Sequence, residues 1–346
     1  MTHDTVTVAQ LGEFDELIDV RSPAEFALDH VPGARNCPVL DNEERARVGT
    51  LYTQVSIFEA RKVGAALVAR NIARHIEEQF RERAREWRPL VYCWRGGKRS
   101  GAMTHILRQV GWDARQLAGG YKSFRRAVVA DLKQKIPALT FRVICGMTGT
   151  GKSKLLQQLA ARGAQVLDLE ALAEHRGSLL GSMPGIAQPS QKMFETRLWQ
   201  ALRALDPAQP VYVESESRKI GDVRTPESLL TRMWSSDCIV IHAEMNVRVE
   251  LLLSEYRHLT LDRALLHDRL DCLIPLHGRE RIEVWKVLAD GGDWHAFVET
   301  ILTQHYDPSY QKSIGKHYPN LPNGRQFQLQ SAQSGDCAAL ALTVHR

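Results

Sequence analysis

The chain has 346 residues, 44% hydrophobic and 25% charged, a composition typical of globular proteins with room for two cores. No apolar run approaches the roughly 20 residues that span a membrane, and residues 1–4 do not begin a signal peptide. Lys and Arg outnumber Asp and Glu by 45 to 40, which permits nucleic-acid binding but equally fits an ordinary mixed-charge surface. We therefore expect a cytoplasmic protein that does not bind a membrane.

The six cysteines are scattered singly, and none forms a Cys-x-x-Cys pair. This spacing is typical of proteins from a reducing compartment. It argues against a disulfide framework and against a cysteine-rich zinc site. We predict no metal-ligating set of side chains.

The first part of the chain alternates strands with helices. Strands are predicted at 16–20, 90–92 and 116–118 from their apolar residues, and helices at 57–80 and 101–110 from apolar residues at helical spacing. A His-Val-Pro-Gly-Ala turn occupies residues 30–34. This alternation predicts an α/β fold with a parallel sheet.

A boundary is predicted at 130–139, where Pro137 interrupts the pattern, so that residues 1–135 and 136–346 form two domains. Further strands are expected at 141–145, 165–168, 210–214 and 238–242. Helices are expected at 191–205, 226–234 and 247–256, and a mostly helical pattern at 259–306. The last forty residues or so are polar and receive no assignment.

The loop Cys-Trp-Arg-Gly-Gly-Lys-Arg-Ser at 93–100 directly follows the strand at 90–92. Backbone N–H groups that converge at a helix N-terminus lower the pKa of a thiol and bind an anion beside it. Gly96 and Gly97 allow the necessary curvature. Three cations of the loop add positive charge, namely Arg95, Lys98 and Arg99. We interpret Cys93 as a reactive thiolate, the alternative being a small buried hydrophobe.

A second loop, Gly-Met-Thr-Gly-Thr-Gly-Lys-Ser at 146–153, matches the G-x-x-x-x-G-K-[ST] phosphate-binding pattern between a strand and a helix. Its amides can wrap a phosphate, its lysine can meet the terminal phosphates, and its serine can hold Mg²⁺. The predicted donor-binding residues of this loop are Gly146, Thr148, Gly149, Thr150, Gly151, Lys152 and Ser153.

Carboxylates follow two other predicted strands. Glu214 and Glu216 end the strand at 210–214, where many P-loop proteins carry an aspartate, and we assign both to the donor site. A solvated strand end is the alternative. The Asp-Leu-Glu run at 168–170 either lies near the same site or caps a helix.

The Asp-Val-Arg-Ser-Pro-Ala-Glu-Phe run at 19–26, the turn at 30–34 and the Gly-Gly-Tyr run at 119–121 resemble the signatures of a rhodanese domain around its active-site loop. Five residues separate Cys93 from Arg99, whereas sulfurtransferase rhodaneses usually have four. The longer loop resembles that of related phosphatases. It should hold a larger tetrahedral anion, so a phosphate-bearing donor is favoured over thiosulfate.

The order of the motifs from residue 19 to residue 310 resembles bacterial tRNA 2-selenouridine synthases, in which a rhodanese domain precedes a P-loop domain. The resemblance includes the runs at 48–54, 168–170, 175–178, 188–195, 214–221 and 306–310. It implies a rhodanese-like parallel-sheet domain, then a P-loop NTPase-like α/β domain with a helical C-terminal part.

This resemblance implies a transferase that converts the wobble 2-thiouridine of tRNA to 2-selenouridine, with selenophosphate as the selenium donor. It further implies an S-geranyl intermediate made from geranyl diphosphate, with Mg²⁺ as an aid to diphosphate departure. Cys93 carries over as the selenation residue, together with its loop. The residues that carry over as contacts to tRNA or donor are Gly64, Gly96, Gly97, His175 and Arg176. A helix–helix contact is the alternative for Gly64.

Candidates for tRNA contact remain open. Four arginines at 81–88 surround Trp87, although an amphipathic helix surface would look the same, and Arg125 and Arg126 follow Tyr121. The His-Arg-Gly run at 175–177 is the better candidate, as a lid. A selenophosphate-supplying enzyme is a further expected partner. Two rivals remain: a P-loop kinase fused to a rhodanese-type sulfurtransferase or phosphatase that ignores tRNA, and a regulatory module with an inactive rhodanese domain.

Overall fold

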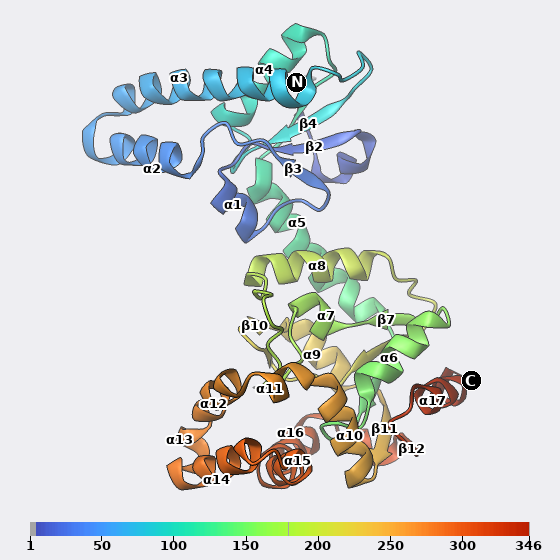
Figure 1. Cartoon of the computed structure of the whole chain (residues 1–346). Helices are drawn as coiled ribbons and strands as arrows, with labels where there is room; N and C mark the ends of the chain where they lie inside the picture. Colours follow the sequence, from blue (N-terminus) through green and yellow to red (C-terminus); the bar gives the residue numbers. More distant parts are fainter. Residues whose placement is uncertain (1–4, 179, 346) are drawn as a thin grey trace. The chain divides into compact units, whose positions relative to one another are not determined.

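The computed structural model describes residues 5–178 and 180–345 and divides into two compact units. Residues 1–4, on which the expectation of no signal peptide rested, lie outside the described part. The first unit comprises residues 1–132 with residues 190–200, and the second comprises 133–189 with 201–346. Figure 1 shows both, coloured along the sequence. Among the described residues, no helix combines the length and apolar character needed to cross a membrane.

The first unit is built on a five-stranded parallel sheet, as predicted. Its strand order is β1-β5-β4-β2-β3, so β4 is the central strand and every one of its residues is buried. The strands are β1 (Thr5–Val6), β2 (Glu16–Asp19), β3 (Ala34–Asn36), β4 (Pro89–Tyr92) and β5 (Arg115–Leu117).

Helices accompany this sheet. Its α-helices are α1 (Pro23–Leu28), α2 (Asn42–Thr50), α3 (Ile57–His75), α4 (Lys98–Val110), α5 (Gly120–Lys135) and, from further along the chain, α8 (Gln191–Arg203). Shorter helical segments are η1 (Val8–Glu13), η2 (Leu51–Val55) and η3 (Ile76–Phe80). Helices α2 and α3 form a hairpin that contains both the predicted helix at 57–80 and a preceding helix that the sequence analysis did not assign (Figure 1).

The predicted boundary at 130–139 is helical rather than an extended linker. Helix α5 continues to Lys135, and the short segment η4 (Ile136–Ala138) follows with Pro137 in its first turn. Proline fits there because the first turn of a helix needs no N–H donor at that position.

The first ten residues of α8 belong with the first unit through a set of polar and aromatic contacts. Arg125 pairs with Glu195 and donates to Thr196 Oγ1 at 3.0 Å. Trp199 donates to Asp131 at 2.9 Å and meets Phe124 edge-on. The chain therefore returns to the first unit after it has entered the second.

The second unit carries another five-stranded parallel sheet, in the order β12-β11-β6-β8-β7. Its strands are β6 (Phe141–Cys145), β7 (Gln165–Leu167), β8 (Val211–Glu214), β11 (Asp237–Ala243) and β12 (Arg325–Leu329), with a separate ribbon of β9 (Lys219–Ile220) and β10 (Val223–Arg224). Strand β12 was not predicted, because among its residues only Leu329 is buried and the apolar pattern is weak.

Helices precede and follow these strands. They are α6 (Lys152–Ala161), α7 (Leu169–Ala173), α9 (Glu227–Trp234), α10 (Met245–Glu255), α11 (Arg257–Leu261), α12 (Arg263–Asp271), α13 (Ile274–His277), α14 (Arg279–Asp290), α15 (Trp294–Ile301), α16 (Asp307–His317) and α17 (Ser334–His345), with η5 (Leu302–Tyr306) and η6 (Leu321–Asn323). The mostly helical pattern predicted at 259–306 is confirmed. Asp168 caps α7 by accepting from the Ala171 N–H at 2.8 Å, and it also lines the cavity at the P-loop, so both alternatives for this residue hold.

A buried ion pair holds the first unit together beneath its cysteine loop. The Arg21 guanidinium is 1% exposed and donates to Asp19 at 2.6 to 3.0 Å and to the Asp29 carbonyl at 2.6 Å. It also lies 3.9 Å from the centre of the Tyr121 ring. Since Asp19 ends β2 and Tyr121 begins α5, this one side chain joins sheet, loop and helix.

We predict that Arg21→Ala destabilises the first unit by about 3–5 kcal/mol, because it leaves the buried Asp19 carboxylate without its partner. Hydrogen exchange of the β2 and β4 amides measures this, since it reports the opening of one unit. The matched control is Arg35→Ala, which removes a half-exposed pair with Glu16 and should cost about 0–1 kcal/mol. Equal protection in wild type and Arg21→Ala would contradict the prediction.

Candidate active site

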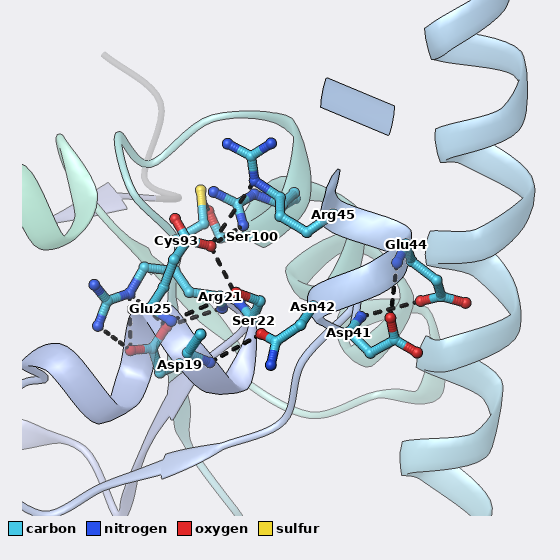
Figure 2. Close-up of polar contacts among 12 residues, drawn as sticks. Asp19, Arg21, Ser22, Glu25, Asp41, Asn42, Glu44, Arg45, Cys93 and Ser100 are labelled. Carbon is cyan, nitrogen blue, oxygen red and sulfur yellow. Dashed lines mark hydrogen bonds and ion pairs between the residues drawn. The ribbon is translucent and has the colours of Figure 1, made fainter. Parts of the chain in front are cut away.

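The thiol of Cys93 lies at the carboxyl end of the central strand β4, where helix α4 begins. Its sulfur accepts from the Gly97 N–H at 3.3 Å and from the Ser100 hydroxyl at 3.1 Å. Figure 2 shows Cys93 beside Ser100, with Asp19, Arg21, Ser22 and Glu25 nearby. The loop thus gathers donors on the sulfur, as its sequence predicted.

Close packing of glycines fixes the shape of the loop. Gly96 has a φ of +62°, and Gly120 behind it has a φ of +58°. A Cβ on Gly120 would lie 2.2 Å from the Cys93 carbonyl oxygen, so a side chain cannot fit there. The Tyr121 N–H donates to that same carbonyl at 2.8 Å. The Gly-Gly-Tyr run therefore serves as the back support of the cysteine loop.

Ser100 is oriented by a neighbour that the sequence analysis missed. Gln116 Nε2 donates to the Ser100 hydroxyl oxygen at 2.8 Å and to the Gly97 carbonyl at 3.1 Å. Because the serine oxygen already accepts from this amide, its own proton is available for the sulfur. The serine could have been found from its place directly after Arg99, whereas Gln116 is the middle residue of β5 and has no local signal.

Electrostatics favour the thiolate. Burial alone would raise the pKa of the Cys93 thiol, but hydrogen bonds from Ser100 and Gly97 and the charge of Arg99 outweigh burial and lower this pKa below its ordinary value. The Arg99 guanidinium is partly buried and pairs with Glu25 at 2.9 Å. Arg95 and Lys98 are exposed at the loop surface. The alternative of an inert buried cysteine is therefore disfavoured.

A cavity of about 610 Å³ lies beside the loop. Its walls are largely apolar and include Leu40, Val48 and Val68, while Arg45, Lys98 and Arg99 bring positive charge. Gly64 on α3 is part of the lining, and a Cβ there would touch Val48 at 3.4 Å. Gly64 thus lies at the contact between α2 and α3, as the alternative interpretation expected, and it also borders the cavity.

The P-loop follows β6, the central strand of the second sheet, as predicted. Lys152 Nζ donates to the carbonyls of Gly146 and Met147 at 2.8 and 3.2 Å, which are loop groups that a bound phosphate would displace. The Gly146 N–H donates to the Tyr310 hydroxyl at 2.7 Å. A cavity of about 590 Å³ opens here.

Arg248 supports the P-loop from behind. Its side chain is 4% exposed, donates to the Thr148 carbonyl at 2.9 Å and forms a two-point ion pair with Asp307 at 2.5 and 3.0 Å. Asp307 lies next to Tyr306 in the run at 306–310, so this part of the resemblance has a structural role.

Three carboxylates gather at one side of the P-loop cavity. Oxygens of Glu170, Glu214 and Glu216 lie within 4.8 Å of one another. Burial and neighbouring carboxylates raise the pKa of Glu170 and of Glu216, and burial raises that of Glu214. Glu214 Oε1 is buried and has no hydrogen-bond partner among the described residues. Oxygen ligands of this kind suit Mg²⁺, so the residues fit a cation that the sequence analysis placed only at Ser153, 3.5 Å from Glu170.

An apolar slot adjoins the P-loop cavity. Both are lined by Thr148, Leu252, Tyr256 and Tyr306. Beyond these shared residues the slot is walled by Leu266, Trp294, Phe297, Val298 and Ile301. Its open volume is only about 60 Å³, so a hydrocarbon chain would enter by moving these side chains apart. Sequence reasoning missed the slot because its walls come from helices far apart in the chain.

His175 and Arg176, the predicted contacts to tRNA or donor, differ in whether they line the P-loop cavity. Arg176 lines the P-loop cavity and donates to the Glu255 carbonyl at 2.5 Å, whereas His175 is 7% exposed and is absent from the cavity lining. Burial lowers the pKa of His175. Of the predicted pair, only Arg176 is placed to meet a ligand in this structure.

Several of the predicted candidates for tRNA contact are buried or paired with carboxylates in the structure. The run at 81–88 is a turn rather than an amphipathic helix, so that alternative is wrong. Trp87 is 6% exposed and packs between Phe80 and Trp112, so it cannot stack on a splayed base. Tyr121 is also buried, and Arg125 is engaged by Glu195 and Asp29. Arg126 is exposed.

Comparison with known proteins gives the same two-part organisation. The rhodanese-like domain matches residues 6–127, and the tRNA 2-selenouridine synthase AAA domain matches residues 139–270. The tRNA 2-selenouridine synthase of Marinobacter nauticus is 35% identical over 327 residues, which cover 86% of this chain and 88% of the relative. This chain belongs to the tRNA 2-selenouridine synthase family.

Other members of the family agree. The enzyme of Aeromonas salmonicida is 31% identical over 86% of this chain and 87% of its own length. That of Nitrosomonas europaea is 38% identical over 69% of this chain and 63% of its own length. The resemblance drawn from the motifs is therefore confirmed, as is the fold class of a rhodanese domain followed by a P-loop domain.

We predict that the reactivity of Cys93 persists below the pH range of an ordinary thiol. The alkylation rate follows the thiolate fraction, so a lowered pKa moves the midpoint of its pH profile down, and Ser100→Ala moves the midpoint back up. The measurement is mass analysis of the Cys93 peptide after timed treatment with iodoacetamide. Coincident profiles for wild type and Ser100→Ala would contradict it.

Proposed function

We propose that this chain is a tRNA-modifying transferase that replaces the sulfur of a wobble 2-thiouridine with selenium from selenophosphate. The reaction passes through S-geranyl-2-thiouridine, made with geranyl diphosphate. Residues 1–135 carry the selenation site, and residues 136–346 carry the geranyl-donor site. Membership of the family supports the tRNA substrate, and the geometry of the two loops supports the donors.

The geranyl-donor site divides into a polar and an apolar part. The diphosphate occupies the P-loop cavity, with Lys152 released from the Gly146 and Met147 carbonyls to meet it. Ser153, Glu170, Glu214 and Glu216 would hold Mg²⁺. That ion would supply positive charge against the diphosphate when bound.

The observation that carries the choice of donor is that the apolar slot adjoins the P-loop cavity and shares lining residues with it. A nucleotide would present a polar sugar and base to the slot, and these would leave their hydrogen bonds unmade against Leu266, Phe297 and Val298. A ten-carbon chain has no hydrogen bonds to lose there and gains by leaving water, once the side chains of the slot have moved apart. The kinase reading is therefore the weaker one.

Both transfers balance without any change of oxidation state. In the first, the thiocarbonyl sulfur forms a bond to C1 of the geranyl group, diphosphate leaves with the electron pair of the broken C–O bond, and N3 of the base loses its proton to water. In the second, selenium forms a bond to C2 of the base, and the C2–S bond breaks. The sulfur leaves as geranyl thiolate, a better leaving group than sulfide.

The cavity beside Cys93 receives the S-bound geranyl group during the second transfer. Its volume of about 610 Å³ lies in the range of roughly 300–1,000 Å³ typical of ligand pockets. Leu40, Val48 and Val68 offer apolar surface, and Gly64 keeps the cavity open. Arg45 and Lys98 suit the tRNA backbone.

We predict that two variants stop the reaction at different nucleosides. Supplied with 2-thiouridine tRNA and both donors, Cys93→Ser accumulates S-geranyl-2-thiouridine, because it lacks only the selenation thiol. Lys152→Ala leaves 2-thiouridine, since loss of a charge that meets the departing diphosphate slows geranyl transfer about a hundredfold. The measurement is mass analysis of the wobble nucleoside after digestion. The same unreacted nucleoside in both variants would contradict the assignment of selenation to Cys93 and of geranyl transfer to the P-loop.

We further predict that geranyl diphosphate raises the thermal midpoint of the protein more than inorganic diphosphate does at the same ligand concentration, because its hydrocarbon chain adds affinity in the apolar slot. Binding to the folded state alone stabilises it by about 2.7 kcal/mol at a hundredfold excess over Kd. Differential scanning fluorimetry with each ligand and Mg²⁺ tests this, with Lys152→Ala as the control that should lose both effects. Protection by ATP without protection by geranyl diphosphate would favour the kinase.

A further inference from the structure

We propose that Cys93 takes the phosphoryl group of selenophosphate and not its selenium. The sulfur attacks phosphorus, a phosphocysteine forms, and selenium is released as hydrogen selenide beside the nucleobase. This inference rests on the proposed use of selenophosphate and assigns the atom on which the thiolate acts.

The balance of electrons decides whether the thiolate attacks the selenium or the phosphorus of selenophosphate. If the thiolate attacked selenium, phosphorus would have to leave with the P–Se electron pair, at the oxidation level of phosphite. An oxidant would then be needed to reach phosphate, and the reaction supplies none. Attack on phosphorus leaves every oxidation state unchanged: the S–P bond forms, the P–Se bond breaks, and the selenide leaves with the electron pair.

Two further steps complete the cycle. Hydrogen selenide adds as HSe⁻ to C2 of the S-geranyl base, its remaining proton passes to N3, and geranyl thiolate is expelled as the C2–S bond breaks. Water then attacks the phosphocysteine, the S–P bond breaks, and inorganic phosphate and the Cys93 thiolate are released. One water is consumed, and the thiol returns to its starting state.

The loop is built for a tetrahedral phosphoryl group above the sulfur. The five residues between Cys93 and Arg99 form an arc, and the Gly97 N–H already points at the sulfur from 3.3 Å. Arg99 is held by Glu25 at 2.9 Å, and its guanidinium can bind two phosphoryl oxygens. Because α4 begins at Lys98, the positive end of its dipole adds to this charge.

Ser100 has a second role in the phosphoryl route, besides its hydrogen bond to the free thiolate. Its hydroxyl donates to Cys93 Sγ at 3.1 Å, while its oxygen accepts from Gln116. When water cleaves the phosphocysteine, the sulfur must depart as a thiolate, and this hydrogen bond stabilises the charge that develops on it. At a pH above the alkylation midpoints of wild type and Ser100→Ala, Cys93 is a thiolate in both, so loss of the hydroxyl should slow breakdown of the intermediate and cause it to accumulate.

A matched control lies one turn further along α4. Thr104 is also buried, and its hydroxyl has no hydrogen-bond partner among residues 5–178 and 180–345. Thr104→Val removes a hydroxyl from the same helix without touching the sulfur. Ser100→Ala and Thr104→Val thus differ in whether the deleted group contacts Cys93.

The test supplies the full-length protein and S-geranyl-2-thiouridine tRNA with selenophosphate radiolabelled either in phosphorus or in selenium. The protein is denatured at neutral pH during turnover, and the Cys93 peptide is isolated. We expect the phosphorus label on Cys93 in wild type and at least tenfold more in Ser100→Ala. Thr104→Val should match wild type, and Cys93→Ser should carry no label.

The same samples are assayed for 2-selenouridine, which separates this inference from the proposed function. Selenium label on Cys93 without phosphorus label, or no label on the peptide of any variant while wild type makes 2-selenouridine, would overturn the phosphoryl route and leave the function standing. Absence of 2-selenouridine with wild type would instead overturn the proposed function.

Discussion

Both candidate sites depend on one physical constraint: a helix that starts where a parallel strand ends leaves backbone N–H groups unpaired and aimed at the same point. In the first unit this point is the sulfur of Cys93, between β4 and α4. In the second it is the P-loop, between β6 and α6. Each loop follows the central strand of its sheet, where flanking strands hold the backbone most firmly.

The two loops differ in how their charge is balanced. Around Cys93 the nearby cations, Arg99 among them, suit an anion without help from a metal. At the P-loop, Glu170, Glu214 and Glu216 oppose an anion unless a cation intervenes, and burial together with mutual repulsion raises the pKa of Glu170 and Glu216. An anionic donor alone fits the first site, whereas the second fits a diphosphate together with Mg²⁺. This contrast is what we expect if the two sites handle different donors.

Much of the architecture could be predicted, because local patterns report directly on parallel strands and on glycine loops. The central strands at 90–92 and 141–145, both loops and the helix at 57–80 were found this way. The edge strand β12 was missed, since a strand with one buried residue has no apolar signature. The place of Trp87 was misjudged, because arginines beside an aromatic look the same whether the ring is exposed or packed against Phe80 and Trp112.

By itself, the sequence determined which residues are candidates for the chemistry: Cys93 with its glycines and cations, and Lys152 with its phosphate loop. Their spacing has meaning within a few residues, where chain connectivity alone dictates geometry. Only the tertiary structure decided what surrounds them. Gln116 reaches Ser100, Arg248 supports Thr148, and an apolar slot opens beside the P-loop. Gln116 and Ser100 are 16 positions apart in the chain, and Arg248 and Thr148 are 100 positions apart. The packing of whole elements brings such residues together, and no local sequence pattern indicates it.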